Sequence, residues 1–381
     1  MIYLDNAATT RTAPEVVEAM TPYFTQYYGN AGSIYGLGSE SKKALLRARE
    51  TIAGTLGAEA NEIYFTAGGS ESDNWALKAV FEALRDKGKH IITSKIEHHA
   101  VLHTCDYLEK MGAEITYLDV DAEGVVDPLQ LKRVIRPDTI LISVMTANNE
   151  VGTIQPVKEI GEIAAKHGIL FHTDAVQAYG HLPVDVKECH IDLLSASAHK
   201  FNGPKGVGFL YIGKRARIRA FIHGGQQERG RRAGTENVPG IVGMAVAAGR
   251  AHERLNERAE TERALRDYLI GRIEERIPGV MLNGHREKRL PNNVNFGFAG
   301  MEGETMLIML DMAGICASAG SACTSGSTDP SHVLLAMGLS GEQARGSLRL
   351  TLSEENTREE LDLVVEELAR IVERVRGMLV R

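Results

Sequence analysis

The sequence predicts an α/β protein with a mainly parallel sheet that is covered by helices on both faces. Short apolar runs, such as residues 139–144 and 169–174, have the length of buried strands, and longer stretches with helical spacing separate them. Strands that alternate with helices in this way pair in parallel, because each helix returns the chain to the starting edge of the sheet. Ligands of such sheets bind beyond the carboxyl ends of the strands, so reactive side chains are expected there.

The first half of the chain supplies the elements of this sheet. Residues 14–28 and 39–56 are expected to form helices, the second ending at Gly57, a residue typical of helix ends. The expected strands are residues 63–66, 90–94, 114–119, 139–144, 169–174, 192–197 and 207–212. Helices are expected after Gly69, through His103, around Leu131 and over residues 157–167.

The character of the sequence changes after Pro239. Residues 240–277 are rich in alanine and in paired charges, and they are expected to form one long helical stretch. Strands are expected at residues 294–298 and 347–353. A final core-facing helix is expected to follow the capping box Thr357-x-x-Glu360.

Composition and charge exclude several classes of partner. With 43 basic and 50 acidic residues the formal net charge is −7, which argues against nucleic acid or an anionic membrane. No stretch approaches the roughly 20 apolar residues that span a bilayer, and no secretion signal is evident, so a cytoplasmic protein is expected. The 4 cysteines are too few for a disulfide framework in so long a chain, which leaves a reactive thiol available.

Asp174 ends one expected strand and Lys200 follows another, so both can reach one crevice. A lysine in an apolar crevice is hard to protonate and stays a nucleophilic amine that forms a Schiff base with a carbonyl. An aspartate keeps a basic ring nitrogen protonated, because the ion pair holds the proton. Pyridoxal phosphate (PLP) has both groups and a phosphate. A strand-end aspartate and a surface lysine remain the alternative at this point.

Two further segments begin helices at the same edge of the expected sheet. Gly68, Gly69 and Ser70 lie where backbone N–H groups bind a phosphate, although Ser70-x-x-Asp73 equally fits an ordinary helix cap. His98 is placed to lie over a planar ring, with a structural histidine as the alternative. His99 and His103, four residues apart, would suit a metal ion, but no third ligand is evident.

Asn149 and Gln177 also follow strand ends and can hydrogen-bond a ring substituent, although ordinary turn formation explains an asparagine equally well. Small residues surround Cys323 on both sides. They predict a mobile, exposed loop over about residues 318–332 that can carry a thiol into and out of a site. Joint metal binding by Cys316 and Cys323 lacks a second pair of ligands.

Eight segments of the sequence closely resemble cysteine desulfurases of the NifS/IscS type, which are class V aminotransferases of PLP fold-type I. The matching segments are YLDNAATT, FTAGGSESDN, EHHAVL, ANNEVGTIQP, HTDAVQAYG, SASAHKFNGPKGVG, RRAGTENVPG and CASAGSACTSGSTDPSHVLLAMG. They cover nearly the whole chain in the family's order. The resemblance implies a large domain over residues 16–255, a small α+β domain over residues 256–381 that carries the cysteine loop, and a segment at residues 1–15 that packs with the small domain.

The resemblance also implies roles for single residues. Lys200 would form the Schiff base with PLP, Asp174 would pair with the ring nitrogen, and His98 would stack on the ring. The remaining implied cofactor contacts come from Gly69, Ser70, Asn149, Gln177, Ser197, His199 and, from a second subunit, Thr235. Asn149 would also contact the substrate. Arg345 is the implied clamp for the substrate carboxylate, with Arg349 as a rival, because a planar guanidinium binds a carboxylate in two places.

The implied reaction converts L-cysteine to L-alanine and leaves the sulfur as a persulfide on Cys323. Lys200 would move the proton, and His98 would manage the protonation of the thiol. A homodimer is expected, and the sulfur would pass to an iron–sulfur scaffold protein of the NifU/IscU type. Ligation of a transferred iron–sulfur cluster by Cys323 is a second role left open. A selenocysteine lyase or another PLP enzyme of the same fold is the alternative function.

Overall fold

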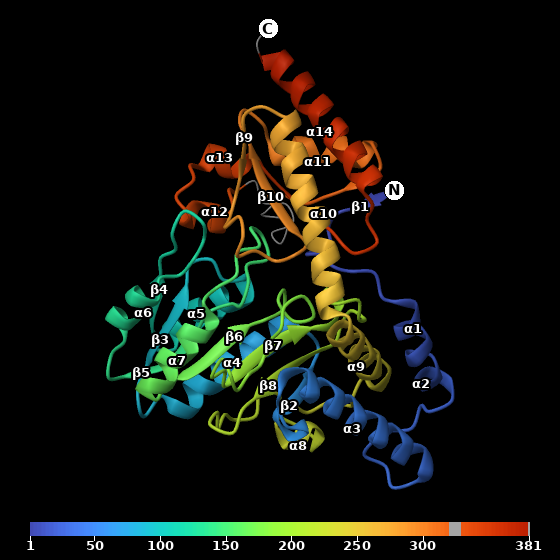
Figure 1. Ribbon diagram of the computed structural model, residues 1–381. Coiled ribbons are helices and arrows are strands. Elements are labelled where there is room, and N and C mark those ends of the chain that lie inside the picture. The colour runs from blue at the N-terminus through green and yellow to red at the C-terminus, as the bar shows by residue number, and fades with distance from the viewer. Residues whose placement is uncertain (320–328, 380–381) are drawn as a thin grey trace.

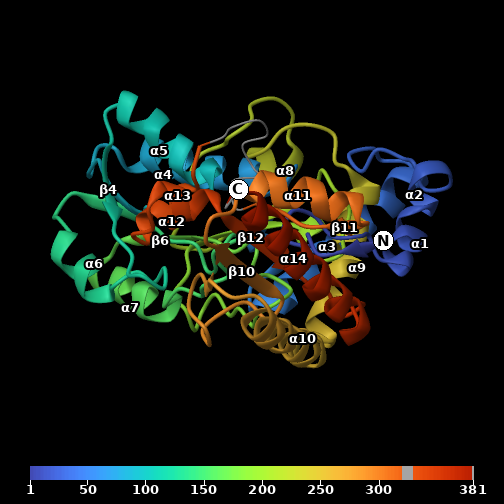
Figure 2. The ribbon, with the colours of Figure 1, turned by 90° about the horizontal axis from the view of Figure 1, so that it is seen from above.

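The computed structural model describes residues 1–319 and 329–379, which form two stacked parts (Figures 1 and 2). The large part contains a seven-stranded sheet, and the carboxyl-terminal part, drawn in orange and red, lies on one end of it. The predicted α/β fold with a mainly parallel seven-stranded sheet is confirmed. No helix within the two described ranges is long and apolar enough to cross a membrane.

The large sheet has the strand order β2-β8-β7-β6-β5-β3-β4. Its strands are β2 (Ile63–Thr66), β3 (His90–Ser94), β4 (Glu114–Leu118), β5 (Thr139–Ser143), β6 (Leu170–Asp174), β7 (Leu193–Ser197) and β8 (Gly208–Ile212). Only β8 runs in the direction opposite to the other six strands, so the carboxyl ends of β3, β5, β6 and β7 share one edge. Every residue of β5 to β8 is buried, which explains why these strands have continuous apolar sequences.

Helices cover both faces of this sheet. One face packs against α3 (Gly36–Leu56), α7 (Val157–His167) and α9 (Val238–Glu253), and the other against α4 (Gly69–Leu84) and α5 (His99–Lys110). Successive residues of a strand point to opposite faces, so Ile92 belongs to the first core and Ile91 to the second. The other helices here are α1 (Pro14–Met20), α2 (Pro22–Thr25), α6 (Pro128–Val134), α8 (Gln227–Gly230) and the short 3-10 turns η1 (Ala60–Glu62) and η2 (Ala198–Lys200).

The carboxyl-terminal part has a hydrophobic core of its own. Its antiparallel sheet has the order β12 (Ser347–Thr351), β10 (Asn293–Phe298) and β9 (Val280–Leu282), and it packs against α10 (Leu255–Arg276), α11 (Gly303–Met312) and α14 (Arg358–Leu379). β1 (Ile2–Tyr3) pairs in parallel with β11 (Ile315–Cys316), and α12 (His332–Ala336) and α13 (Gly341–Arg345) complete this part. The predicted domain boundary near residue 255 stays a prediction.

Two predicted helices are broken in the structure. The helix expected over residues 14–28 is divided between Met20 and Pro22, because proline has no N–H to donate to the preceding turn. The stretch expected over residues 240–277 is divided at Arg254, which has non-helical dihedral angles. α9 packs on the large sheet and α10 on the small one, so the chain bends between the two cores. The predicted capping box of Thr357 and Glu360 is confirmed at α14.

Candidate active site

A pocket of about 260 Å³ lies where the carboxyl ends of β5, β6 and β7 meet the amino-terminal segment and β12. Nine residues that the sequence analysis assigned to the cofactor line this pocket: Gly69, Ser70, His98, Asn149, Asp174, Gln177, Ser197, His199 and Lys200. They lie at or just after the carboxyl ends of five strands, β2, β3, β5, β6 and β7, which are separated in the sequence. The parallel strand order brings them together, as the edge rule for such sheets predicts.

Lys200 and Asp174 are held by backbone groups. Asp174 is the last residue of β6, and Lys200 ends the turn η2 that follows the neighbouring strand β7. Lys200 Nζ donates to the carbonyl oxygens of Ala7 at 2.6 Å and Ala8 at 2.8 Å. Asp174 Oδ1 accepts from the Val176 N–H at 2.8 Å. Burial raises the pKa of Asp174 to about 6, although this hydrogen bond and the charge of Lys200 lower it.

His98 is the N-cap of α5, where its Nδ1 accepts a hydrogen bond from the Ala100 N–H at 3.1 Å. Burial lowers the pKa of His98 to about 4, and the nearby charges of Lys200, His99 and His103 act in the same direction. The imidazole is therefore neutral at pH 7. Nδ1 is fixed as an acceptor, which leaves Nε2 as the N–H donor of this tautomer.

Asp73 is a pocket residue that the sequence analysis assigned only to a helix cap. The N-cap of α4 is instead Gly68, and Asp73 is 1% exposed and lines the pocket. Burial and the charge of Asp174 raise the pKa of Asp73 well above its usual range. Among the described residues, the one group of three close metal-type ligands is Asp73, His98 and Asp174. Within residues 1–319 and 329–379, His99 and His103 therefore belong to no group of three close metal-type ligands.

One end of the pocket fits a phosphate group. It contains the first residues of α4, whose N–H groups have no partner within the helix. A Cβ on Gly69 would lie 2.5 Å from Cγ2 of Val176, so only glycine lets the backbone approach this closely. Ser197 and His199 face the same pocket, and His199 Nδ1 is hydrogen-bonded to Thr9 Oγ1 at 3.1 Å. An anion site, an amine and an acid in one pocket match the phosphate, carbonyl and ring nitrogen of PLP.

The structure separates the two arginines proposed for the substrate. Arg345 ends α13, is exposed and does not line the pocket. Arg349 lies in β12, its side chain is 2% exposed, and it does line the pocket. Its Nη2 donates to Asp5 Oδ1 at 2.9 Å and its Nη1 to the carbonyl oxygen of Asn149 at 3.0 Å. The pocket therefore favours the rival Arg349 over Arg345, because β12 places the Arg349 side chain in the pocket and α13 ends outside it, and the carboxylate-binding role itself stays a prediction.

The described residues of this pocket leave two predicted residues untested. Thr235 is exposed in the segment before α9, so its predicted contact with the cofactor needs a second copy of the chain and stays a prediction. Cys323 lies outside the described residues. Ser318, shortly before it, exchanges two backbone hydrogen bonds with Arg349, and His332, shortly after it, contacts the carbonyl oxygen of Glu97 through Nε2 at 3.0 Å. Both described flanks therefore adjoin the pocket.

Comparisons with known proteins agree with this geometry. Residues 2–364 match the family described as aminotransferase class-V. The chain is 58% identical over 377 residues to cysteine desulfurase IscS from Methanosarcina thermophila, covering 99% of this chain and 93% of that protein. It is 56% identical to cysteine desulfurase IscS from Clostridium botulinum strain Hall, covering 99% and 96%.

Solved structures show the same fold. A structure named NifS-like protein superposes with a TM-score of 0.92 at 41% identity, covering 98% of this chain and 99% of that chain. An apo structure of a cysteine desulfurase from Thermococcus onnurineus superposes with a TM-score of 0.87 at 28% identity, covering 98% and 94%. The similarity therefore extends over both parts of the chain.

Proposed function

The chain belongs to the aminotransferase class-V family and is a PLP-dependent cysteine desulfurase, and from this premise we propose which residues carry the reaction. Lys200 offers the amine to which the cofactor attaches, and Asp174 keeps the ring nitrogen protonated. Arg349 binds the substrate carboxylate. The observation that carries this proposal is that these three residues line one pocket although they are far apart in the sequence.

The cofactor-binding residues divide the pocket into regions of different chemistry. PLP, when bound, supplies a carbonyl that bonds to amino groups and a ring that withdraws electrons from the substrate. Gly69, Ser70, Ser197 and His199 would hold the phosphate. His98 would lie on the ring, and Gln177 and Asn149 would hydrogen-bond its substituents, Asn149 reaching the substrate as well. The neutral imidazole of His98 suits this place, because it adds no second positive charge beside Lys200.

Lys200 is also the group proposed to move a proton at the α carbon of the substrate. To act there, the amine of Lys200 would have to lie close to that carbon. The carbonyl oxygens of Ala7 and Ala8 accept hydrogen bonds from Nζ, so they stabilise an ammonium at the pocket. These two contacts support the proposal that Lys200 both receives and returns the proton.

Cys323 is the proposed sulfur acceptor. Its thiolate attacks the sulfur of the substrate, an S–S bond forms, the bond between that sulfur and the substrate's β carbon breaks, and L-alanine is released after protonation. His98 is the residue proposed to manage the protonation of the thiol: its neutral ring would donate from Nε2 to the sulfur and so stabilise the thiolate. The described residues on both sides of Cys323 support the proposal, because Ser318 is bonded to Arg349 and His332 to the residue before His98.

The proposed partners follow from the product. A persulfide on Cys323 would supply sulfur to an iron–sulfur scaffold protein of the NifU/IscU type, with L-cysteine as the sulfur source. The proposed assembly is a homodimer, in which Thr235 of each copy reaches the pocket of the other. Exposed apolar side chains at Phe24, Tyr28 and Ile34 support a surface that a second copy covers.

A single-turnover assay with L-cysteine tests this function. The native protein and the Cys323→Ser variant are compared for release of alanine and sulfide, with Cys316→Ser as a matched control on the half-buried strand β11. Cys323→Ser is expected to abolish sulfide release and keep the visible absorbance of bound PLP, whereas Cys316→Ser keeps both. Sulfide release at the native rate from Cys323→Ser would overturn the thiol-acceptor role.

A further inference from the structure

The amino-terminal segment from Asp5 to Thr10 is bound to several proposed active-site residues, although its side chains have no role so far. The carbonyl oxygen of Ala7 accepts hydrogen bonds from Lys200 Nζ at 2.6 Å and from Gln177 Nε2 at 2.9 Å. The Thr10 N–H donates to the carbonyl oxygen of His199. The segment therefore forms one wall of the pocket. Its one charged side chain, Asp5, does not line the pocket itself.

Asp5 contacts Arg349 instead. Asp5 Oδ1 accepts from Arg349 Nη2 at 2.9 Å, and Arg349 Nη1 donates to the carbonyl oxygen of Asn149 at 3.0 Å. The guanidinium is thus held at two of its nitrogens by two different chain segments. Its third nitrogen, Nε, is buried and has no hydrogen-bond partner among the described residues. Donor capacity therefore remains on an arginine that faces the pocket.

The backbone fixes Asp5 relative to Arg349. Thr351, two residues after Arg349 in β12, donates its N–H to Leu4 and accepts from the Asn6 N–H. The Ala7 N–H also donates to Thr351 Oγ1 at 2.8 Å. The residues on both sides of Asp5 are thereby tied to the strand that carries Arg349. The carboxylate of Asp5 stands in a set place, so it can direct a long and otherwise mobile side chain.

We propose that Asp5 is a positioning residue that orients the Arg349 guanidinium for the carboxylate of the substrate. A guanidinium binds a carboxylate well only when its fork faces it, and a buried arginine without a counter-charge is costly. Asp5 supplies both the direction and the charge without touching the substrate. This inference rests on the proposed function of Arg349.

Binding of three ligands to Asp5 variants distinguishes a role in orienting Arg349 from a merely structural role of Asp5. L-cysteine and L-alanine carry a carboxylate, whereas cysteamine has the amine and thiol of L-cysteine without it. In the PLP-loaded full chain, Asp5→Ala is expected to raise the KM for L-cysteine and the Kd for L-alanine about tenfold, the effect of one charge-assisted hydrogen bond. The kcat is expected to stay within about threefold and the Kd for cysteamine within about twofold, because neither depends on the carboxylate contact. Binding is followed by the absorbance of the cofactor.

The conservative variant Asp5→Asn provides a second measurement. Its Oδ1 can still accept from Nη2 but carries no charge, so an effect between those of the native protein and Asp5→Ala is expected, and it replaces Asp5→Ala if that variant does not fold. Equal weakening of cysteamine and L-alanine would show a structural role and overturn the inference. Unchanged binding of all three ligands would overturn it as well.

Variants of Arg349 distinguish failure of this inference from failure of the proposed function. If Arg349→Ala leaves the KM for L-cysteine unchanged, the carboxylate role of Arg349 is wrong. If Arg349→Ala raises that KM and the Asp5 variants do not, only the role of Asp5 is wrong. In the double variant Asp5→Ala/Arg349→Ala, the KM is expected to exceed that of Arg349→Ala by less than about twofold, because Asp5 acts through Arg349.

Discussion

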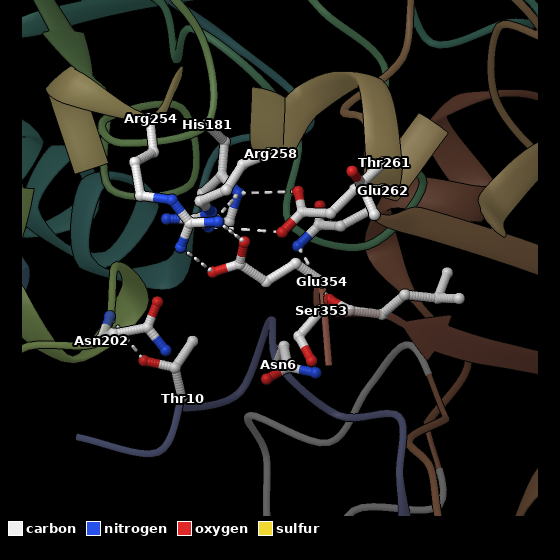
Figure 3. A network of polar contacts seen from close by, with 12 residues as sticks. Asn6, Thr10, His181, Asn202, Arg254, Arg258, Thr261, Glu262, Ser353 and Glu354 are labelled. Carbon is white, nitrogen blue, oxygen red and sulfur yellow. Dashed lines mark hydrogen bonds and ion pairs between the residues drawn. The ribbon is translucent and has the colours of Figure 1, made fainter. Parts of the chain in front are cut away.

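Two clusters of buried ionisable residues lie close to Lys200: in one, Asp174 interacts electrostatically with its side chain, and in the other, His181 contacts its backbone. The first cluster borders the pocket and contains the acids Asp73, Glu97 and Asp174. The second contains His181, Arg258 and Glu262, with Glu354 bound to Arg254 beside it (Figure 3). His181 Nε2 lies 3.1 Å from the carbonyl oxygen of Lys200, so the second cluster reaches the catalytic turn without entering the pocket.

The pKa values of the buried carboxyl groups are shifted in opposite directions in the two clusters, although burial acts in the same direction in both. In the pocket cluster, burial raises the pKa of Asp174 to about 6 and that of Glu97 to about 8. Burial also acts to raise the pKa of Glu262, but the hydrogen bond and charge of His181 and the charge of Arg258 outweigh it and lower that pKa. Burial of a carboxylate therefore does not mark an active site. A buried carboxyl group that lacks a compensating positive charge is the better indicator of an active site, because a positively charged ligand can supply that charge.

The largest expected difference between the clusters concerns activity. Lys200→Ala should reduce the turnover of L-cysteine by about 10³-fold or more, because the amine that moves the proton is lost. The melting temperature should change by only a few degrees, since the carbonyl groups that lose Nζ are uncharged, and Asp174, which loses the charge of Lys200, keeps its hydrogen bond from the Val176 N–H. Alanine release and calorimetry measure the two effects. Lys205→Ala, an exposed lysine in the same loop, is the matched control and should keep native turnover.

In the second cluster, a substitution should change stability strongly and turnover only slightly. Glu262→Gln leaves the buried Arg258 without its counter-charge and should lower the free energy of unfolding by about 3 kcal/mol. Turnover per folded molecule should stay within about threefold of native. Because the folded protein lowers the pKa of Glu262, this loss should shrink as the pH falls below the usual glutamate range. Chemical denaturation at several pH values measures it.

Glu260→Gln, on the exposed side of the same helix, should leave stability unchanged. A drop in turnover as large as the drop in stability for Glu262→Gln would contradict the division between the clusters. It would show that His181 transmits the state of the network to Lys200.

A smaller effect on substrate binding should separate the two arginines. Arg349→Ala should raise the KM for L-cysteine about 100-fold, because a bidentate contact with the carboxylate is lost. Arg345→Ala should change it by less than about twofold, since that side chain is exposed at the end of α13. Steady-state kinetics on both variants measures the effect. A rise for Arg345→Ala alone would return the assignment to Arg345.

These arginines show where sequence reasoning reaches its limit. β5 and β6 were predicted within a residue or two, because a continuous apolar run of that short length is typical of a buried strand. Arg345 and Arg349 lie four residues apart in the segment ARGSLRL, and only the end of α13 and the start of β12 separate them. The break at Arg254 has no glycine or proline to signal it. It results from packing against two different cores, which no local pattern records.

Pocket residues were predicted from the sequence where the type of side chain indicates a chemical role. They were missed where the contribution comes from the backbone or depends on tertiary packing. Lys200, Asp174 and His98 were found because amine, acid and imidazole follow strand ends. Ala7 contributes only its carbonyl oxygen, and any residue at that position offers the same atom. Asp73 was assigned to a helix cap because an acid in the first turn of a helix is common. Its burial next to Asp174 depends on tertiary packing.

The smallest expected effect concerns stability: a glutamate-to-glutamine change at Glu97 should stabilise the protein, whereas the same change at Glu262 should destabilise it. Glu97 is completely buried, and its Oε1 accepts hydrogen bonds from Ser94 Oγ at 2.6 Å and from the Met145 N–H at 3.0 Å. Burial raises its pKa to about 8, although these hydrogen bonds lower it, so the folded protein keeps a proton that the unfolded chain releases at lower pH. The stability of the native protein should therefore fall as the pH rises from about 4.5 to about 8.

Glu97→Gln removes this titration and keeps an oxygen for both hydrogen bonds. Relative to the native protein, its free energy of unfolding should rise by about 1–2 kcal/mol between pH 6 and pH 8, as measured by denaturant unfolding. Glu109→Gln, exposed on α5, should give a curve parallel to that of the native protein. Parallel curves for Glu97→Gln as well would mean that Glu97 is ionised at pH 6. The same glutamate-to-glutamine change would then no longer stabilise one cluster and destabilise the other, and the contrast between unpaired and paired burial would not hold.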